Sequence, residues 1–579
     1  MPIPQRTFHL WTRRRITERQ APSDIPTTVP TAEAVFLILR RMRAPLIVVI
    51  TTFSFCTAGM MLMPGVDPEG NPYRLNVFDA FYQMTITLTT VGFTEAPYPF
   101  SYPQRMWMTL SIILLVISWA YSIGVFLALV QSTAFQAAVA AQQFRRQVRR
   151  LVEPFVIVAG YGDAARLVGA DLDEHYRRFV VIDSREDRVE SVISAQLSSD
   201  VPAIQGDCAT PAVLGLAGLG HRECEGVLAL TNDDDANLAV VMTASLLRPD
   251  LPVLGSCATH RTATRMEHFS PGSAINADDR FGDYLALSIH HPVNHQLLTW
   301  LMDNDQEQLA PERLDLAARR WVVCADGEFA EAMVTDLATA GVTVDLVDPD
   351  GDDVDMSGSV GFVAGTANDT VNIAMAEHAR NVNPDVYLVV RQRTNAKKAL
   401  LDALQIESVY IANEVIAREV LARILTPVFW SFVEHVLTRD EQWATQVRDH
   451  LEDRCGRRTP ERDVITLSAE GAPAVASWLR RGQTLTVRDL MRQPDDREAM
   501  LPLAALVLIR GGEPQFMPPE DTPLAVDDQV LLLGKPGGLS QVREVCHYPA
   551  TVEYLATGRE VPLTWAWSRL AALRRSRNQ

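Results

Sequence analysis

The chain has 579 residues, which is more than one domain requires, and its formal net charge at pH 7 is -18. Because the excess charge is negative, nucleic acid is not expected as a partner. The seven cysteines are scattered without C-x-x-C spacing, which indicates neither a disulfide framework nor a zinc site.

Two uncharged apolar runs, residues 44–64 and 106–130, come first along the chain. Each is long enough to cross a bilayer, which takes about 20 residues. Either run alone could be the buried helix of a soluble protein, but the pair brackets the motif described next, which favours membrane insertion. The chain before the first run is rich in arginine, and the segment between the runs is acidic. The positive-inside rule therefore predicts a multi-pass protein of the inner (plasma) membrane with both termini in the cytoplasm.

A helix predicted over residues 76–87, with Asn76 or Asp79 as its cap, precedes the sequence T-T-V-G-F at residues 89–93. This sequence resembles the selectivity filter of potassium channels, in which backbone carbonyl oxygens replace the hydration shell of the ion. The resemblance implies a pore helix, K⁺ as the permeant ion and a homotetramer around one pathway. It also implies a set of filter and mouth residues: Thr90, Val91, Gly92, Phe93 and Thr94 in the filter, and Glu95 concentrating cations at the outer mouth.

One position departs from the family pattern. The family usually has G-Y-G-D where this chain has Gly92-Phe93-Thr94-Glu95. Positive φ is accessible to glycine but unusual for a β-branched residue, so Thr94 predicts a different backbone geometry at the outer mouth. A weakly selective cation channel is therefore the alternative to a potassium-selective one.

Gly124 lies within the second apolar run, where glycine costs on the order of 1 kcal/mol relative to alanine. It can serve as a gating hinge or allow close packing against a neighbouring helix. A basic helical linker follows over residues 132–153, and its arginines can contact the headgroups of membrane lipid.

The composition then changes to that of a soluble α/β protein. An apolar strand over residues 155–159 leads into G-Y-G-D-A-A at residues 160–165, a helix, and a second strand that ends at Asp183. This order and spacing are typical of a dinucleotide-binding unit, in which glycines let backbone N–H groups approach a pyrophosphate and the acid accepts from ribose hydroxyls. Asp183 favours NAD or ADP/ATP over NADP, although Arg185 lies close by. A fold that kept the turn and lost the ligand is the alternative.

Two further motifs are Q-G-D-C-A-T at residues 205–210 and L-T-N-D-D-D-A-N-L at residues 230–238. Together with the filter they resemble the RCK domains that regulate potassium channels and transporters. The resemblance implies a nucleotide site at Gly160, Gly162, Ala165 and Asp183, with Asp207 at the next strand end. The acidic triplet 233–235 lacks the spacing of a calcium-binding EF-hand, so helix capping by Asn232 or Asp233 is favoured.

The pattern then recurs. Residues 321–325 and 344–348 are predicted strands, and Asp348 follows Ala325 at the spacing that separates Asp183 from Gly160. This predicts a second RCK-like copy. Its turn contains Asp326 and Glu328, and their negative charge disfavours pyrophosphate binding. The turn could instead have a structural role or bind a cation. Ca²⁺ is therefore a further candidate ligand.

The predicted fold is thus an α-helical membrane pore of two transmembrane helices, a pore helix and a filter loop, followed by α/β Rossmann-like tandem RCK domains and a small α+β RCK carboxyl-terminal subdomain. The predicted boundaries are 1–43 for a basic cytoplasmic segment, 44–131 for the pore, 132–153 for the linker, 154–318 and 319–458 for the two RCK domains, 459–540 for the subdomain and 541–579 for a basic tail, which is either solvated or packed against the ring or membrane.

We expect a ligand-gated potassium channel whose four chains contribute eight RCK copies to a cytoplasmic ring that responds to a small-molecule ligand, either a nucleotide or a divalent cation. A membrane-anchored NAD-dependent oxidoreductase would share the glycine-rich turn. No catalytic His, Lys or Tyr constellation accompanies that turn, and the filter sequence would be unexplained. The protein is therefore not expected to be an enzyme.

Overall fold

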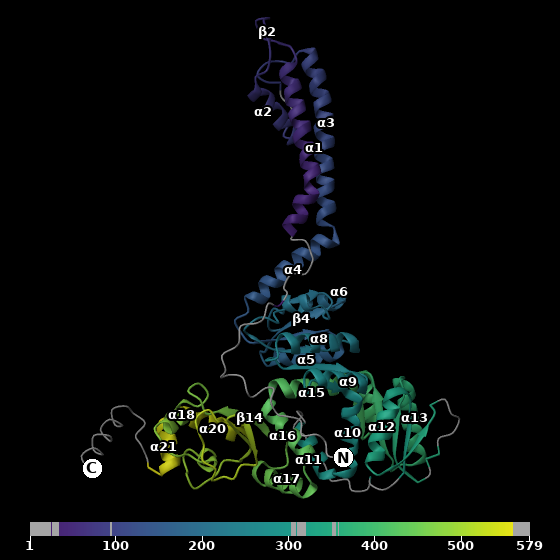
Figure 1. Cartoon of the computed structure of the whole chain (residues 1–579), viewed down its shortest axis with the longest axis vertical. Coiled ribbons are helices and arrows are strands. Elements are labelled where there is room, and N and C mark those ends of the chain that lie inside the picture. Colours follow the sequence, from purple (N-terminus) through teal and green to yellow (C-terminus); the bar gives the residue numbers. More distant parts are fainter. Residues whose placement is uncertain are drawn as a thin grey trace, which may run out of the picture.

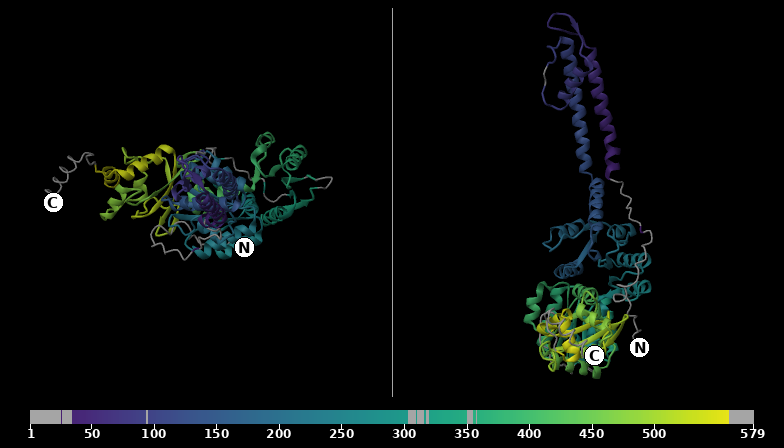
Figure 2. Two further views of the ribbon diagram at one scale, coloured as in Figure 1. Left: turned by 90° about the horizontal axis from the view of Figure 1, so that it is seen from above. Right: turned by 90° about the vertical axis from the view of Figure 1, so that its left-hand side faces the viewer.

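The computed structural model describes residues 25, 34–92, 95–302, 309, 316, 320–349, 355–356 and 358–559. A long helical hairpin stands above the rest of the chain, and helix α4 (Thr133–Arg149) descends from it to the first α/β unit (Figure 1). A second α/β unit and a smaller module lie side by side beyond the first unit (Figures 1 and 2). Phe93 and Thr94 of the predicted filter, and residues 560–579 of the predicted tail, lie outside the described residues.

The hairpin consists of α1 (Ala34–Leu62) and α3 (Tyr102–Val130), which run side by side. The short strands β1 (Gly65–Val66) and β2 (Pro72–Tyr73) and the helix α2 (Val77–Leu88) lie between them in sequence. Gly59 permits a close approach of α1 to Trp107 of α3, because a Cβ at Gly59 would lie 1.9 Å from the indole ring. The indole N–H in turn donates to the carbonyl oxygen of Cys56 at 3.0 Å.

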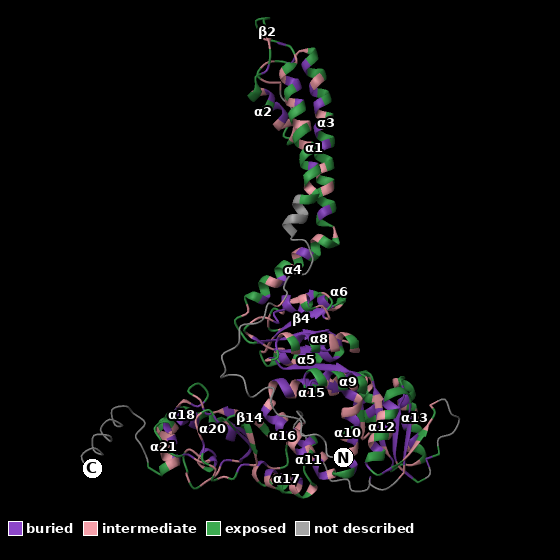
Figure 3. Cartoon of the chain, in the orientation of Figure 1, coloured by how far each residue is buried: buried purple, intermediate pink, exposed green. Residues whose placement is uncertain are grey.

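Both long helices present apolar side chains outward. Ile50 is 61% exposed and Ile117 is 62% exposed, and exposed residues follow α3 and the part of α1 from Arg40 onward (Figure 3). Segments Arg40–Leu62 and Tyr102–Val130 are long and apolar enough to cross a membrane. By length and composition alone, these two helices support the predicted membrane part.

The helix predicted over residues 76–87 forms as α2. Of the two candidate caps, Asn76 is confirmed: its side-chain oxygen accepts from the backbone N–H of Asp79 at 2.8 Å. The predicted helical linker also forms, as α4. Its Phe144 and Val148 are buried in the core of the first α/β unit, so α4 is fixed to that unit by packing.

The first α/β unit has a six-stranded parallel sheet in the order β5-β4-β3-β6-β7-β8. This is the order of a doubly wound dinucleotide-binding fold. Its strands are β3 (Phe155–Ala159), β4 (Arg178–Asp183), β5 (Ala203–Gln205), β6 (Cys224–Ala229), β7 (Val253–Cys257) and β8 (Ala274–Asn276). Its helices are α5 (Asp163–Glu174), α6 (Glu186–Ser194), α7 (Pro211–Leu216), α8 (Asp234–Leu247), α9 (His260–Phe269) and α10 (Ala277–His290). All five β3 residues are buried, which explains their continuous apolar run.

A second parallel sheet, ordered β10-β9-β11-β12-β13, forms where the sequence repeat predicts it. Its strands are β9 (Arg320–Ala325), β10 (Thr343–Val347), β11 (Ser359–Gly365), β12 (Tyr387–Gln392) and β13 (Ser408–Ile411). Its helices are α12 (Gly327–Thr339), α13 (Asp369–Val382), α14 (Lys398–Ala403) and α15 (Ala412–Leu425).

The two units exchange their last helices. Helix α10 follows the first sheet in sequence, yet its Phe281 and Leu285 pack in one core with Trp321 of the second sheet. Helix α15 follows the second sheet, yet its Val420 and Ile424 pack in the core around α5 of the first unit. Figure 1 shows α15 directly beneath the first unit and α10 beside α12. Each unit therefore completes its core with a helix from the other.

The remaining module is α+β, with an antiparallel sheet ordered β14-β17-β15-β16. Its strands are β14 (Glu461–Thr466), β15 (Leu503–Arg510), β16 (Glu513–Phe516) and β17 (Gln529–Gly534), and helices α11 (Pro292–Met302), α16 (Pro427–Leu437) and α17 (Glu441–Cys455) pack on one face. Helices α18 (Pro473–Arg480), α19 (Val487–Leu490), α20 (Pro536–His547) and α21 (Pro549–Thr557) contribute to a second core. Val542 and Leu555 are buried in that core, so the module extends past residue 540 to Thr557.

Candidate functional site

The glycine-rich turn after β3 depends on Gly160. Its φ is +90, in the region that favours glycine. A Cβ there would lie 2.6 Å from Cγ2 and 2.7 Å from the backbone N of Thr231, the second residue after β6. The Gly160 N–H donates to the carbonyl oxygen of Ile182 at 2.7 Å. Gly160 thus holds the turn against the carboxyl ends of β4 and β6.

The N-terminus of α5 lies next in the chain and has no side-chain cap. Gly162 occupies the N-cap position, so the first backbone N–H groups of the helix have no capping oxygen within their own turn. A Cβ on Gly162 would lie 3.4 Å from Oδ1 of Asn232 and 3.9 Å from a guanidinium nitrogen of Arg188. Free amides, the positive end of a helix and a nearby guanidinium are the features that bind an anion such as a phosphate. Ala165 is fully buried, and its role here is helix–strand packing.

Asp183 ends β4 and is only 3% exposed. Its Oδ2 accepts from the backbone N–H of Tyr161 at 2.7 Å and lies 3.3 Å from Nη1 of Arg188, and its Oδ1 accepts from the N–H of Arg185 at 2.8 Å. The carboxylate therefore orders the glycine-rich turn itself. Oδ2 has two donors and Oδ1 has one, so Oδ1 keeps accepting capacity that a ribose hydroxyl could use. The Arg185 side chain turns to Asp187 instead, at 2.5 Å and 3.0 Å.

Asp207 follows β5 and is exposed. It accepts from the N–H of Ala209 at 2.9 Å, so it also orders its own turn. Three acids lie near the buried Cys208 thiol: burial raises its pKa to about 11, and the charges of Asp207, Asp183 and Asp233 add to that rise. The predicted residues Gly160, Gly162, Asp183 and Asp207 therefore meet at one edge of the sheet, and Ala165 lies just behind it.

A buried asparagine that was not predicted from the sequence supports this edge. Oδ1 of Asn237 accepts from the backbone N–H of Thr231 at 2.9 Å, and its Nδ2 donates to the carbonyl oxygens of Thr231 and Ser256, both at 2.9 Å. Asn372 repeats this arrangement with Thr366 in the second unit. A repeated sequence motif could have identified both asparagines, because Thr and Asn are six positions apart in both T-N-D-D-D-A-N and T-A-N-D-T-V-N.

The acidic triplet has a structural explanation. Asp233 caps α8 by accepting from the N–H of Asp235 at 3.0 Å and of Ala236 at 3.4 Å, which confirms one of the two predicted caps. Asp234 accepts from the N–H of Ala258 at 2.9 Å.

The turn of the second unit differs in length. In the first unit, residues 160–162 separate β3 from α5, whereas Asp326 alone separates β9 from α12. Gly327 has a φ of +63 and opens α12. Asp348 is exposed, in contrast to the buried Asp183. This shorter acidic turn lacks the cradle of the first unit.

The described part of the predicted filter follows α2 directly. Thr90 has a φ of 58 and Gly92 a φ of 144, and Val91 is 80% exposed. Among the residues that the structure describes, none donates a hydrogen bond to the carbonyl oxygens of Thr90, Val91 or Gly92. Oxygens of this kind can accept a cation.

Glu95 lies beyond the filter and binds Arg105 at the start of α3. Its oxygens accept from Nε of Arg105 at 2.9 Å and from Nη2 at 3.1 Å, and Oε2 also accepts from the N–H of Phe100 at 3.0 Å. The hydrogen bonds from Arg105 lower the pKa of Glu95. Gly124 lies in the interior of α3, and no described atom would come within 4 Å of a Cβ there. Packing within the chain therefore does not require this glycine.

Comparison with protein families gives a match within the first unit. Residues 156–275 match the TrkA-N domain, a range that begins in β3 and ends in β8. The first unit is thus similar to a TrkA-N domain over its whole sheet.

Solved structures give weaker similarities to the chain. The GsuK channel bound to NAD covers 89% of this chain and 100% of its own, at 12% identity and a TM-score of 0.40. The human SLO3 gating ring covers 66% of this chain and 99% of its own, at 8% identity and a TM-score of 0.37. The Kef CTD of Shewanella denitrificans in its AMP-bound form covers 23% and 77%, at 20% identity and a TM-score of 0.19. TM-scores below 0.5 establish neither a shared fold nor a shared ligand. Comparison with curated proteins gives no significant match.

Proposed function

We propose that the chain is a ligand-gated potassium channel, in which four copies form one pore and a cytoplasmic ring of eight RCK domains. The observation that carries this proposal is the sequence T-T-V-G-F, which directly follows a capped helix between two helices long and apolar enough to span a membrane. The match of the first unit to the TrkA-N domain supports a regulatory α/β unit attached to that pore.

The ligand proposed for this unit is NAD or ADP/ATP. The uncapped N-terminus of α5 would receive the phosphates, with Arg188 beside it, and Asp183 would accept from ribose hydroxyls. Ca²⁺ stays a second candidate input, although the described residues contain no group of three or more His, Cys, Asp or Glu side chains that could hold it.

A mechanical route from this site to the pore follows from the helices. Helix α3 ends at Val130, α4 begins at Thr133, and α4 is packed into the core of the first unit through Phe144 and Val148. A nucleotide that binds one arrangement of the ring more tightly than another would therefore act on α3 through α4. The shift in the open–closed equilibrium cannot exceed the ratio of its affinities for the two states.

Recording of single channels in planar bilayers tests the channel proposal. The purified chain is placed under a potassium/sodium gradient, and NAD, ADP or Ca²⁺ is added to the cytoplasmic side. A reversal potential near the potassium equilibrium value, with a ligand-dependent open probability, is expected. A reversal potential near zero would instead support the weakly selective cation channel that Thr94 favours. Absence of current under every condition would contradict both.

Equilibrium binding of NAD and ADP to the full chain in detergent tests the ligand site. Asp183→Asn is expected to weaken binding several-fold, because the amide cannot accept at both of its terminal atoms. Asp187→Asn is the matched control, since Asp187 is an exposed acid in α6, a short distance further along the chain, that binds Arg185. Unchanged affinity in Asp183→Asn would remove Asp183 from the site.

A further inference from the structure

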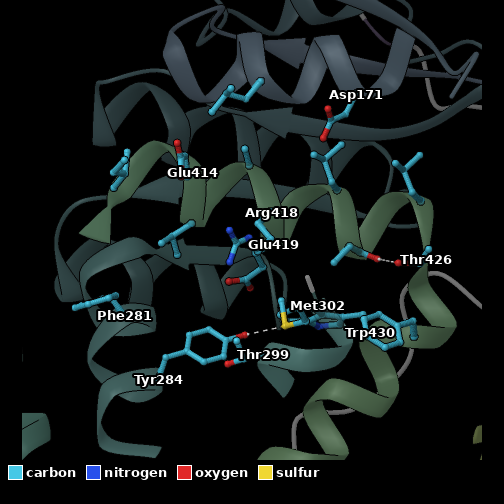
Figure 4. Close-up of a pocket in the computed structure, with 18 of the residues that line it drawn as sticks. Asp171, Phe281, Tyr284, Thr299, Met302, Glu414, Arg418, Glu419, Thr426 and Trp430 are labelled. Carbon is cyan, nitrogen blue, oxygen red and sulfur yellow. Dashed lines mark hydrogen bonds between the residues drawn. The ribbon is translucent and has the colours of Figure 1, made fainter. Parts of the chain in front are cut away.

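A large cavity lies away from the nucleotide edge, where both α/β units meet the C-terminal module. Its volume is about 1500 Å³, and helices α5, α10, α11, α15 and α16 line it. A typical small-molecule site occupies about 300–1,000 Å³, so one ligand would fill only part of this space. Figure 4 shows Arg418, Tyr284, Thr299, Met302 and Trp430 on one side of α15, and Asp171 on the other.

Two hydrogen-bond donors, Arg418 and Tyr284, lie at one end of the cavity. The Arg418 side chain is exposed to the cavity and forms no hydrogen bond or ion pair with any residue in the described part of the chain. The Tyr284 hydroxyl donates to the thioether sulfur of Met302 at 3.6 Å, which is a weak acceptor. Burial raises the pKa of Tyr284 to about 12, so this hydroxyl remains a donor at neutral pH.

The acids of α15 near this end are already engaged. Glu419 is 4% exposed and binds Arg280 at 2.9 Å and also Arg423, and Glu414 accepts from Asn395. These contacts leave Arg418 without a carboxylate from its own helix.

Three other basic side chains that line the cavity, those of Arg177, Arg462 and His295, do not compete with Arg418 for an anion. Arg177 binds Glu225, and Arg462 lies over the ring of Phe429 at 4.6 Å and donates to the carbonyl oxygen of Leu301. Burial lowers the pKa of His295 to about 4, so its imidazole is neutral at physiological pH. Arg418 is therefore the guanidinium available to a ligand.

Apolar and aromatic side chains line the rest of the Arg418 end of the cavity. Trp430 and Phe281 line the cavity together with Leu285, and the indole N–H of Trp430 donates to Glu434 at 2.8 Å. The guanidinium of Arg423 covers one face of the Trp430 ring, 5.0 Å from its centroid, so a ligand would have to use the other face. A fixed indole can stack on an aromatic ligand without a further loss of side-chain freedom.

We propose that the Arg418 end of this cavity binds a small organic anion with an aromatic body. The guanidinium of Arg418 binds the anionic group, the Tyr284 hydroxyl donates to one of its oxygens, and the aromatic body lies against Trp430. This site is separate from the turn at Gly160, and its occupancy would connect α10, α11, α15 and α16.

Equilibrium dialysis of radiolabelled benzoate against the full chain in detergent tests the proposal. Wild-type protein is expected to bind one benzoate per chain in a saturable manner. Arg418→Gln is expected to lower the affinity at least tenfold and Tyr284→Phe several-fold. Arg265→Gln, which changes an exposed arginine on α9 outside the cavity, is expected to bind as wild type does.

Competition completes the design. Phenyl phosphate should displace benzoate if the site accepts phosphate as well as carboxylate, and benzyl alcohol should fail because it lacks the charge. Equal binding by wild type and Arg418→Gln, or equal competition by benzyl alcohol, would overturn the proposal. Loss of benzoate binding in Asp183→Asn would place the ligand at the nucleotide edge and would overturn it too. None of these outcomes depends on ion conduction, so the test is independent of the proposed channel function.

Discussion

Substitution of Gly160 by alanine tests the geometry of the glycine-rich turn. The new Cβ would lie 2.6 Å, 2.7 Å and 2.8 Å from Cγ2, N and Cα of Thr231. Backbone atoms cannot move aside as a flexible side chain can, and Asn237 binds both the N–H and the carbonyl oxygen of Thr231. Left-handed backbone costs about 1–2 kcal/mol for a residue with a Cβ, and overpacking about 1–3 kcal/mol. Gly160→Ala should therefore destabilise the first unit by about 2–5 kcal/mol.

Gly162→Ala is the matched control. Gly162 has a φ of -78, and its Cβ would make only an ordinary contact of 3.4 Å with Asn232. Its cost should stay below about 1 kcal/mol, the typical value for loss of a good N-cap residue. The methyl group would nevertheless stand where a phosphate approaches α5, so nucleotide affinity should fall.

Thermal unfolding of the full chain, combined with hydrogen exchange of peptides from β3 and β6, separates the two effects. A stability change of 1 kcal/mol moves the midpoint of a domain of this size by about 2–4 °C, so Gly160→Ala should lower it by roughly 4–20 °C. Faster exchange should be confined to the first unit. A midpoint within 1 °C of wild type, or equal falls in both variants, would refute the reasoning.

Three further predictions test other contacts. Arg105→Gln should free the Glu95 carboxylate and raise single-channel potassium conductance at low ionic strength, whereas Glu95→Gln should lower it; both effects should fade in high salt. Burial, then the charges of Asp283 and Asp279, raise the pKa of Asp336 to about 7. This folded-state pKa is higher than the pKa of an ordinary Asp, so the stability of the wild type should decline as the pH rises from about 4 to 7 and should level off above pH 7. Thermal unfolding measured across this pH range should show no such decline for Asp336→Asn. Glu419→Ala should destabilise by about 3–5 kcal/mol in urea unfolding, since it leaves the buried Arg423 and the half-buried Arg280 without the Glu419 carboxylate, whereas Glu470→Ala on an exposed turn should have little effect.

The elements that local sequence specifies were predictable. The buried residues of β3 form a continuous apolar run because both faces of a parallel sheet are covered, and the glycines after it mark the turn. The spacing from Gly160 to Asp183 located the acid at the edge of the sheet. Its bond to the N–H of Tyr161 was not predictable, because that bond depends on the orientation of a peptide group in the folded turn.

Contacts between distant segments could not be read from local patterns. Arg280 and Glu419 meet across 139 positions because α10 and α15 are exchanged between the units. Amphipathic periodicity shows that each helix has an apolar face but not which sheet that face covers. For the same reason the cavity beside Arg418 leaves no mark in the sequence, since its walls come from helices and strands of three structural units.

Helix α15 connects the two candidate ligand sites. Its Val420 and Ile424 pack in the core around α5, the helix whose N-terminus forms the proposed phosphate site, while its Arg418 faces the cavity. A displacement of α5 on nucleotide binding would therefore move the guanidinium relative to Tyr284. If the sites are coupled in this way, the factor by which NAD changes the affinity for benzoate must equal the factor by which benzoate changes the affinity for NAD. Titration of each ligand with and without a saturating concentration of the other measures both factors. If both factors equal one, α15 does not couple the two sites.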